Sequence, residues 1–198
     1  MNMDVDKLQD FVKNTNAYLN SLCEEQEKIN KRYVDIKEEW SDNVLVLVGL
    51  DIMEAQNIII NVYKNLYDQI RETNRHGEYI AEKYLEEKWD GIKMSFDEEI
   101  SRINVEEIMN KRVIRGTTAE GIKSFETALE NYIEETYKLK GLIKKEHEEI
   151  GCSWKDKQYK KVSEIMDEFQ YNMESNLKKL NDTLELVKEK RKIFEEIE

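Results

Sequence analysis

The chain has 198 residues, no proline and only seven glycines, and 37% of its residues are charged. Sandwiches, barrels and wound α/β folds need a turn about every ten residues, so the scarcity of turn formers makes them poor candidates and favours long helices. The 43 acidic and 31 basic residues give a net charge of −12, which disfavours nucleic acids and anionic membrane surfaces as partners.

The first part of the chain is predicted to form two helices joined by a tight bend. Apolar side chains recur at helical spacing through residues 4–39 and again through residues 44–88. Between these runs stand three residues of types that cap helix N-termini, Ser41, Asp42 and Asn43. The run from Leu45 to Val48 is partly β-branched, but it is short and passes directly into helical spacing, so we expect a buried helix start rather than a strand.

A connector with three of the seven glycines separates this pair of helices from a second pair. Within residues 90–124, the segment Ile100–Ile108 is expected to form a short helix and Val113–Gly116 a short extended piece. Helical periodicity then resumes to the end of the chain, with one break at residues 151–153 that predicts a second bend.

The predicted fold class is all-α, with two long antiparallel helical hairpins that form an elongated four-helix bundle or a tandem hairpin arrangement. The predicted organisation is a first helical hairpin over residues 1–89, a connector with a short helix over residues 90–124, and a second helical hairpin over residues 125–198. The longest apolar run, Val44–Leu50, is far shorter than the roughly 20 residues of a membrane span, so we expect no insertion into a bilayer. The N-terminus lacks the basic and apolar regions of a cleaved signal peptide, so the expected location is the cytoplasm, or the outside by a route without signal cleavage.

The two hairpins look like copies of one another at an offset of 114 residues. Without gaps, 14 of the 74 positions in residues 11–84 are identical to their counterparts in residues 125–198. Two of the identical pairs stand at the bends: Trp40 with Trp154, and Asp42 with Asp156. We expect each Trp to fill the wedge between diverging helices and each Asp to cap the helix that follows.

A helix, a bend with Trp and a second helix, without a signal peptide, resemble the WXG-motif proteins of bacterial type VII secretion systems, here as a tandem pair in one chain. The family pattern has Gly two residues after the Trp, where both bends of this chain have Asp. A literal Trp-x-Gly occurs at Trp89-Asp90-Gly91 and is an alternative position for a bend. The family's export signal, a Tyr followed four residues later by Asp or Glu, is not found in the C-terminal arm, where Ser163 follows Tyr159 and Ser175 follows Tyr171.

The resemblance implies hairpins that associate side by side into a four-helix bundle. It also implies one of three roles: a secreted helical protein, an export-targeting module, or a cytoplasmic partner of a secretion substrate.

The sequence shows no constellation typical of catalysis. Neither His76 nor His147 has the Glu three residues earlier that di-iron bundles require, and Cys23 and Cys152 lack the spacing of a zinc site. We therefore expect a non-enzymatic protein without cofactor or metal, which binds a helical protein partner and forms homo- or hetero-oligomers. The alternative is an acidic cytoplasmic immunity or chaperone-like protein, whose charge complements a basic client.

Overall fold

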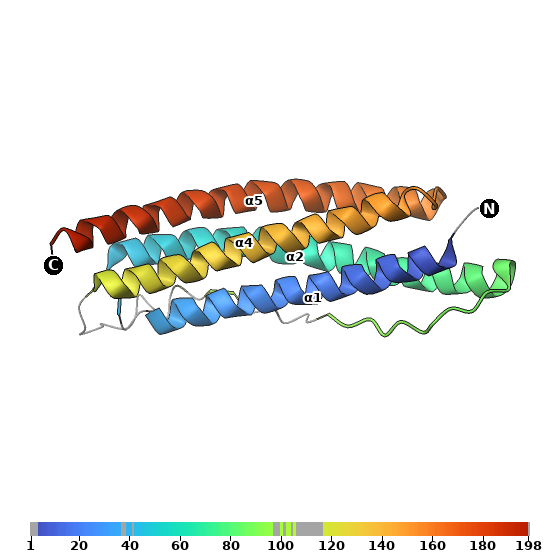
Figure 1. The fold of residues 1–198 in the computed structure, drawn as a ribbon, viewed down its shortest axis with the longest axis horizontal. Coiled ribbons are helices and arrows are strands. Elements are labelled where there is room, and N and C mark those ends of the chain that lie inside the picture. Colours follow the sequence, from blue (N-terminus) through green and yellow to red (C-terminus); the bar gives the residue numbers. More distant parts are fainter. Residues whose placement is uncertain are drawn as a thin grey trace. The chain divides into compact units, whose positions relative to one another are not determined.

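The structure is a computed structural model, and it describes residues 4–36, 39–40, 42–96, 100, 102–103, 105 and 117–197. Most of these residues belong to four α-helices and one π-helical turn (Figure 1): α1 (Val5–Ile36), α2 (Asn43–Ile80), η1 (Ala81–Leu85), α4 (Ala119–Ile150) and α5 (Lys157–Glu195). No strand occurs within the described ranges. The all-α fold class predicted from composition and periodicity is confirmed.

Each α-helix begins at a side chain that accepts a hydrogen bond from a backbone N–H of its first turn. Asp4 Oδ1 accepts from Lys7 N at 3.1 Å, and Thr118 Oγ1 accepts from Gly121 N at 3.0 Å. Asp42 and Asp156 do the same for α2 and α5. These caps replace bonds that the first turn of a helix cannot make within itself, and they fix where each helix starts.

The second helix ends earlier than its periodicity predicts. Helix α2 stops at Ile80, and η1 is followed by Glu86 in the left-handed conformation, with φ at 55°. The apolar start of α2 is helical, as expected, and not a strand. The predicted extended piece Val113–Gly116, and most of the predicted short helix Ile100–Ile108, lie outside the described residues.

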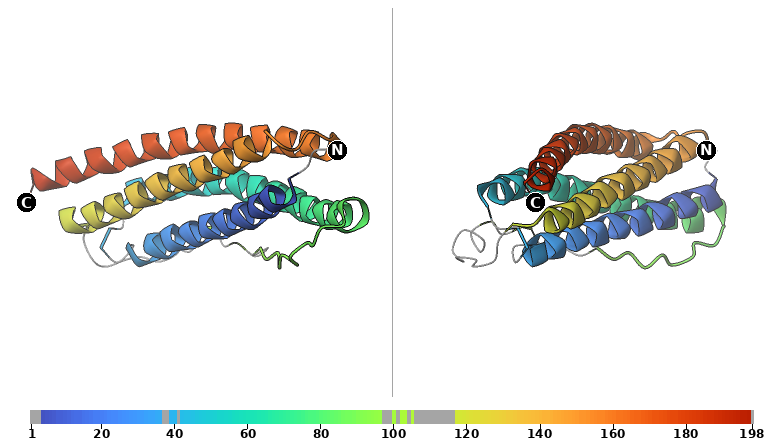
Figure 2. Two further views of the ribbon diagram at one scale, coloured as in Figure 1. Left: turned by 45° about the vertical axis from the view of Figure 1, so that its right-hand side comes forward. Right: turned by 60° about the vertical axis from the view of Figure 1, so that its left-hand side comes forward.

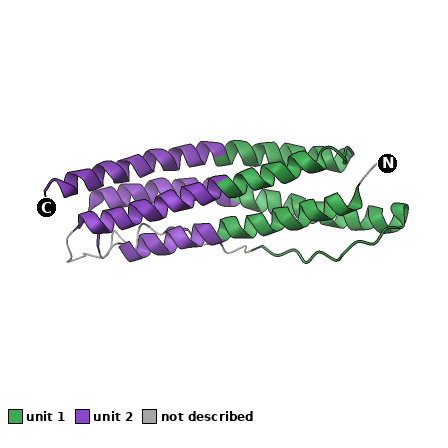
Figure 3. Cartoon of the chain, in the orientation of Figure 1, with its two compact units in different colours: residues 1–23, 61–98, 138–173 green, residues 24–60, 99–137, 174–198 purple. Residues whose placement is uncertain are grey.

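The chain divides into two compact units that cut across the predicted hairpins, since each unit takes a segment of every long helix (Figure 3). Unit 1 comprises residues 1–23, 61–98 and 138–173, and unit 2 comprises residues 24–60, 99–137 and 174–198. The boundaries after residues 23 and 137 are 114 residues apart, which is the offset of the internal repeat. Unit 1 is accordingly built around the second bend and unit 2 around the first.

In unit 1, segments of the four α-helices lie side by side (Figure 3) and enclose an apolar core. The rings of Tyr63 in α2 and Phe169 in α5 have centroids 6.4 Å apart, and Asn14 Nδ2 in α1 donates to Glu146 Oε1 in α4 at 3.0 Å. Helices of the first hairpin therefore pack on helices of the second. The core of this unit includes Leu8, Phe11, Leu19, Leu22, Leu66, Ile70, Ile143, Val162 and Met173.

Unit 2 pairs the same helices through different residues. Tyr132 Oη in α4 donates to Gln26 Oε1 in α1 at 2.8 Å, and Thr183 Oγ1 in α5 donates to Asp51 Oδ2 in α2 at 3.3 Å. Its buried side chains, each stabilising the fold by roughly 1.5–3 kcal/mol, include Ile29, Ile36, Leu45, Val48, Ile52, Ile59, Ile122, Phe125, Leu129, Leu177, Leu180 and Val187. In both units the result is a four-helix bundle.

Helix α2 is the most apolar of the four. Together with η1 it is the one helix in the described part of the chain that is long and apolar enough to cross a bilayer, with a mean hydropathy of 1.5 over 18 residues. A core helix of a bundle gives the same signal by length and composition. Only 44% of that window is buried, however, so apolar side chains of α2 also face outward.

Candidate functional site

The first bend places Trp40 and Asp42 in direct contact in unit 2. The buried indole of Trp40 donates from Nε1 to Asp42 Oδ1 at 2.9 Å, and Val44 N and Leu45 N donate to the same oxygen at 2.9 and 3.3 Å. The Trp40 ring also meets the Phe125 ring edge-on, with centroids 5.9 Å apart. The indole thus fills the space inside the bend while the carboxylate caps α2.

The second bend, in unit 1, likewise combines a buried indole with a capping carboxylate. Trp154 is buried, and its ring lies edge-on to Tyr159 with centroids 5.4 Å apart. Asp156 Oδ1 accepts hydrogen bonds from Gln158 N at 2.8 Å and from Tyr159 N at 2.9 Å. The Trp and Asp that the sequence places at each bend therefore lie where one helix ends and the next begins.

A basic side chain from the other hairpin of the same unit faces each capping carboxylate. Lys190 Nζ in α5 lies 2.7 Å from Asp42 Oδ2, and His76 Nε2 in α2 lies 3.1 Å from Asp156 Oδ2. Residues 76 and 190 are 114 positions apart, as are the two aspartates. The internal repeat therefore extends from the bends to the contacts that the hairpins make with each other.

Both capping carboxylates are held in the ionised form. Burial raises the pKa of Asp42, but hydrogen bonds from Lys190 and Trp40 outweigh it and lower the pKa overall. Burial likewise raises the pKa of Asp156, but hydrogen bonds that include those from the backbone N–H of Tyr159 and the His76 ring outweigh it and lower the pKa overall. Each bend consequently keeps a negative charge at the N-terminus of the helix that follows, where the helix dipole favours it.

The two copies differ at a matched pair of positions near each bend, 33 and 49 in unit 2 and 147 and 163 in unit 1. In unit 2, Tyr33 Oη donates to Leu45 O at 2.9 Å, and the Tyr33 ring occupies the space that a Cβ on Gly49 would need. At the matching positions in unit 1, His147 Nε2 lies 3.0 Å from Ser163 Oγ. Burial lowers the pKa of His147. A large ring beside glycine in one copy is thus replaced by a smaller ring beside serine in the other.

The alternative motif, Trp89-Asp90-Gly91, lies outside the helices in unit 1. Trp89 is buried and donates from Nε1 to Asn74 Oδ1 at 3.1 Å. Asp90 N donates to Gln9 Oε1 at 2.7 Å, while a Cβ added at Gly91 would meet nothing within 4 Å. Trp89 therefore anchors a non-helical segment against α1 and α2, and it does not stand between two helices.

The non-helical segment of residues 86–96 continues along the first hairpin in unit 1 (Figure 1 and Figure 2). Asn74 Nδ2 donates to Ile92 O at 3.3 Å, and the Phe96 ring stacks on Tyr67 with centroids 4.8 Å apart. We call this segment the strap. Residues 90–96 of the strap belong to the predicted connector, but the sequence pattern did not predict that this segment packs on the first hairpin.

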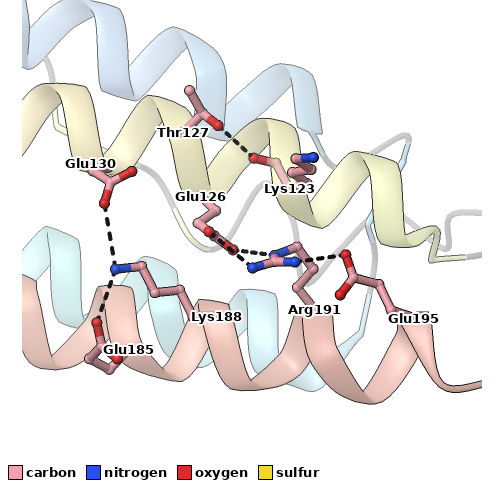
Figure 4. A network of polar contacts seen from close by, with 8 residues as sticks. All are labelled: Lys123, Glu126, Thr127, Glu130, Glu185, Lys188, Arg191 and Glu195. Carbon is pink, nitrogen blue, oxygen red and sulfur yellow. Dashed lines mark hydrogen bonds and ion pairs between the residues drawn. The ribbon is translucent and has the colours of Figure 1, made fainter.

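The second hairpin has charged residues where the first hairpin contacts the strap. The counterparts of Gln9, Asn74 and Gly77 are Lys123, Lys188 and Arg191 in unit 2, and the latter two belong to a network of ion pairs (Figure 4). The network joins Arg191 to Glu126 and Glu195, each at 2.7 Å, and Lys188 to Glu130 and Glu185, at 3.5 and 3.1 Å. This surface is charged, whereas the first hairpin has an apolar anchor at the same register.

A stripe of apolar side chains faces outward on α2 in unit 2. Leu47, Leu50 and Ile58 are 54%, 41% and 40% exposed, at helical spacing on the side of α2 away from the core. We call them the α2 stripe. Their counterparts on α5 in unit 1 are polar or charged: Lys161, Glu164 and Asn172. A position-by-position comparison of the two copies reveals the stripe, whereas helical periodicity alone does not.

The described residues contain no group of three or more His, Cys, Asp or Glu side chains that could hold a metal ion. Neither cysteine is in a disulfide bond; Cys23 is buried and Cys152 exposed.

Comparisons with protein-family models, curated proteins and solved structures found no match to this chain. The resemblance to WXG-motif hairpins accordingly rests on the two bends and on the helices that they join.

Proposed function

We propose that the protein is a non-enzymatic, protein-binding helical module of the kind that type VII secretion systems handle, in which one chain supplies both hairpins of the pair. The packing of the first hairpin on the second within each unit supports the pairing. So do the matched contacts of Asp42 with Lys190 and of Asp156 with His76. In two independent WXG-like chains, an apolar seam on each hairpin would pair with the other hairpin. In this chain that seam is already covered, because the first hairpin packs on the second.

The observation that carries a binding function is the α2 stripe. Exposed leucine and isoleucine side chains contribute little to the bundle core, and apolar side chains gathered on one exposed helix face mark a candidate site of interaction. The second copy of the repeat has Lys161, Glu164 and Asn172 at the same register, so the hairpin fold does not require apolar residues there. The stripe is a property of one copy, and a partner accounts for it.

The net charge of −12 favours a second function, that of an acidic immunity or chaperone-like protein which holds a basic client. The two functions predict different locations for the protein. The export or partner abundance of a secretion-associated module depends on the secretion machinery, whereas a chaperone-like protein remains with its client in the cytoplasm.

The test uses the full chain, expressed in its native host with and without the type VII secretion system. We expect cross-linking to join the wild-type protein to a specific partner and L47K/L50E/I58N to lose that partner at an unchanged melting temperature. The control K161A/E164A/N172A changes the matching positions of the other copy and should retain it. Retention of the partner by the stripe variant would overturn the binding function. Export or partner abundance that does not depend on the secretion system would favour the second function.

A further inference from the structure

We infer that the α2 stripe binds an amphipathic helix whose apolar face is flanked by lysine or arginine. This inference rests on the proposed protein-binding function and adds the chemistry of the partner. The stripe runs from Leu47 to Ile58, which is about 16 Å along a helix, or roughly three turns. Leu47 and Leu50 stand three positions apart and Ile58 eight positions further on, with exposed Glu54 between them on the same face, so the stripe offers two apolar anchor points to a second helix.

The charged residues near the stripe determine which charge the partner needs beside its apolar face. Between residues 43 and 63, the only charged residues of α2 are Asp51 and Glu54, and both are acidic. Thr183 in α5, a neutral residue, donates to Asp51 at 3.3 Å. Lys179 in α5 pairs with Glu54 at 2.5 Å. The contacts with α5 thus neutralise one of the two carboxylates and leave the other as a negative charge beside the stripe.

A second copy of the chain fits this surface poorly. Antiparallel or parallel pairing of two α2 helices would bring the Asp51 carboxylates of the two copies towards one another, with no lysine or arginine in that part of α2 to offset them. An anionic bilayer is repelled by the same carboxylates and by the net charge of −12. A helix with basic flanks has the complementary charge, and electrostatic complementarity selects among partners with similar apolar faces.

The experiment measures the binding of two synthetic peptides to the full chain by calorimetry. Both peptides are helices of about 20 residues with leucines on one face; the basic peptide has lysine at the flanking positions and the acidic peptide has glutamate there. We expect the basic peptide to bind at least about tenfold more tightly than the acidic one, and to weaken as salt is raised. L47K/L50E/I58N should lose most of this affinity. D51N/E54Q, which keeps the stripe, should lose mainly its salt dependence and its preference for the basic peptide.

The outcomes separate the partner's chemistry from the binding function. Equal binding of the two peptides would overturn the basic partner and leave the stripe as a binding surface. Undiminished binding by L47K/L50E/I58N would show that the stripe is not the binding surface, and the proposed function would lose its main support. Two other results would assign the stripe to a different occupant and overturn the inference. One is a wild-type dimer in sedimentation velocity that is absent for L47K/L50E/I58N. The other is binding of the wild type to phosphatidylcholine vesicles.

Discussion

The ring of Trp89 occupies the space that a Cβ on Gly77 would need. Glycine in the interior of a helix costs roughly 0.5–1 kcal/mol relative to alanine, so its presence in α2 calls for a reason. The reason here is the strap, because the Trp89 ring packs on α2 at Gly77 and donates a hydrogen bond to Asn74 of the same helix. A side chain at position 77 would fill the space that the ring needs, which gives the first prediction.

Gly77→Ala is expected to displace the strap. The added methyl group overlaps the Trp89 ring, and overpacking of this kind costs about 1–3 kcal/mol, more than the gain in helix propensity. Thermal unfolding and tryptophan emission measure the effect, which should include a red shift that disappears in a Trp89→Phe background. Gly141→Ala is the control: a Cβ there meets nothing within 4 Å, so that variant should gain roughly 0.5–1 kcal/mol. Stabilisation by both substitutions would contradict the anchoring role of Trp89.

The bend tryptophans are expected to be among the most sensitive positions. Trp40→Ala and Trp154→Ala should each cost about 3–5 kcal/mol, because each removes a fully buried indole and leaves a cavity. Denaturant unfolding gives the change in free energy, and Tyr171→Ala, which removes an exposed aromatic ring, should change it by no more than about 0.5 kcal/mol. If the bend and surface variants unfold at the same denaturant concentration, the wedge role of the indoles is wrong.

A double-mutant cycle tests Tyr33 and Gly49, whose matching residues in the second copy are different. Gly49→Ser places side-chain atoms where the Tyr33 ring lies and should destabilise the protein by roughly 1–3 kcal/mol. Combining it with Tyr33→His reproduces the His147 and Ser163 pair of the second bend, so we expect the two changes to couple favourably by about 0.5–3 kcal/mol. If the change in unfolding free energy of the double variant equals the sum of the two single changes, residues 33 and 49 are not coupled and this prediction is wrong.

The capping carboxylates predict how stability changes with pH. The pKa values of Asp42 and Asp156 lie below the ordinary value of 3.8 in the folded protein, so the unfolded chain binds more protons in acid. Their contribution is present above pH ~4 and is lost as the pH falls through the folded-state values. Melting temperatures measured from pH 7 to pH 2 should fall more steeply for the wild type than for D42N/D156N. Parallel curves for the two proteins would contradict this reading.

Much of the local structure could be predicted from the sequence. The helical spacing of apolar residues and the capping residues at the bends predicted four helices with boundaries close to those of α1, α4 and α5. Such signals are local: a cap such as Asp42 needs only the backbone of the next turn, and a Trp at a bend needs only the two helices beside it. The offset of 114 residues also relates two contacts that periodicity cannot show, those of Asp42 with Lys190 and Asp156 with His76.

The features that sequence reasoning missed depend on tertiary packing. The helical pattern predicted through residue 88 ends at Leu85, after η1, and the packing of Trp89 on Gly77 is a tertiary contact that periodicity cannot show. The α2 stripe was hidden for a different reason. Helix α2 is apolar on several sides near its start, so the outward side is defined only once α1 and α5 have covered the others.

The interleaved composition of the two units has a consequence for synthesis on the ribosome. Unit 1 cannot close before residue 173 has been added, and unit 2 draws on residues up to 198. The first hairpin must therefore wait with its isoleucine and leucine seam uncovered, for roughly 5–20 s at about 5–20 residues per second. During that interval a nascent-chain binding factor would find this apolar seam exposed.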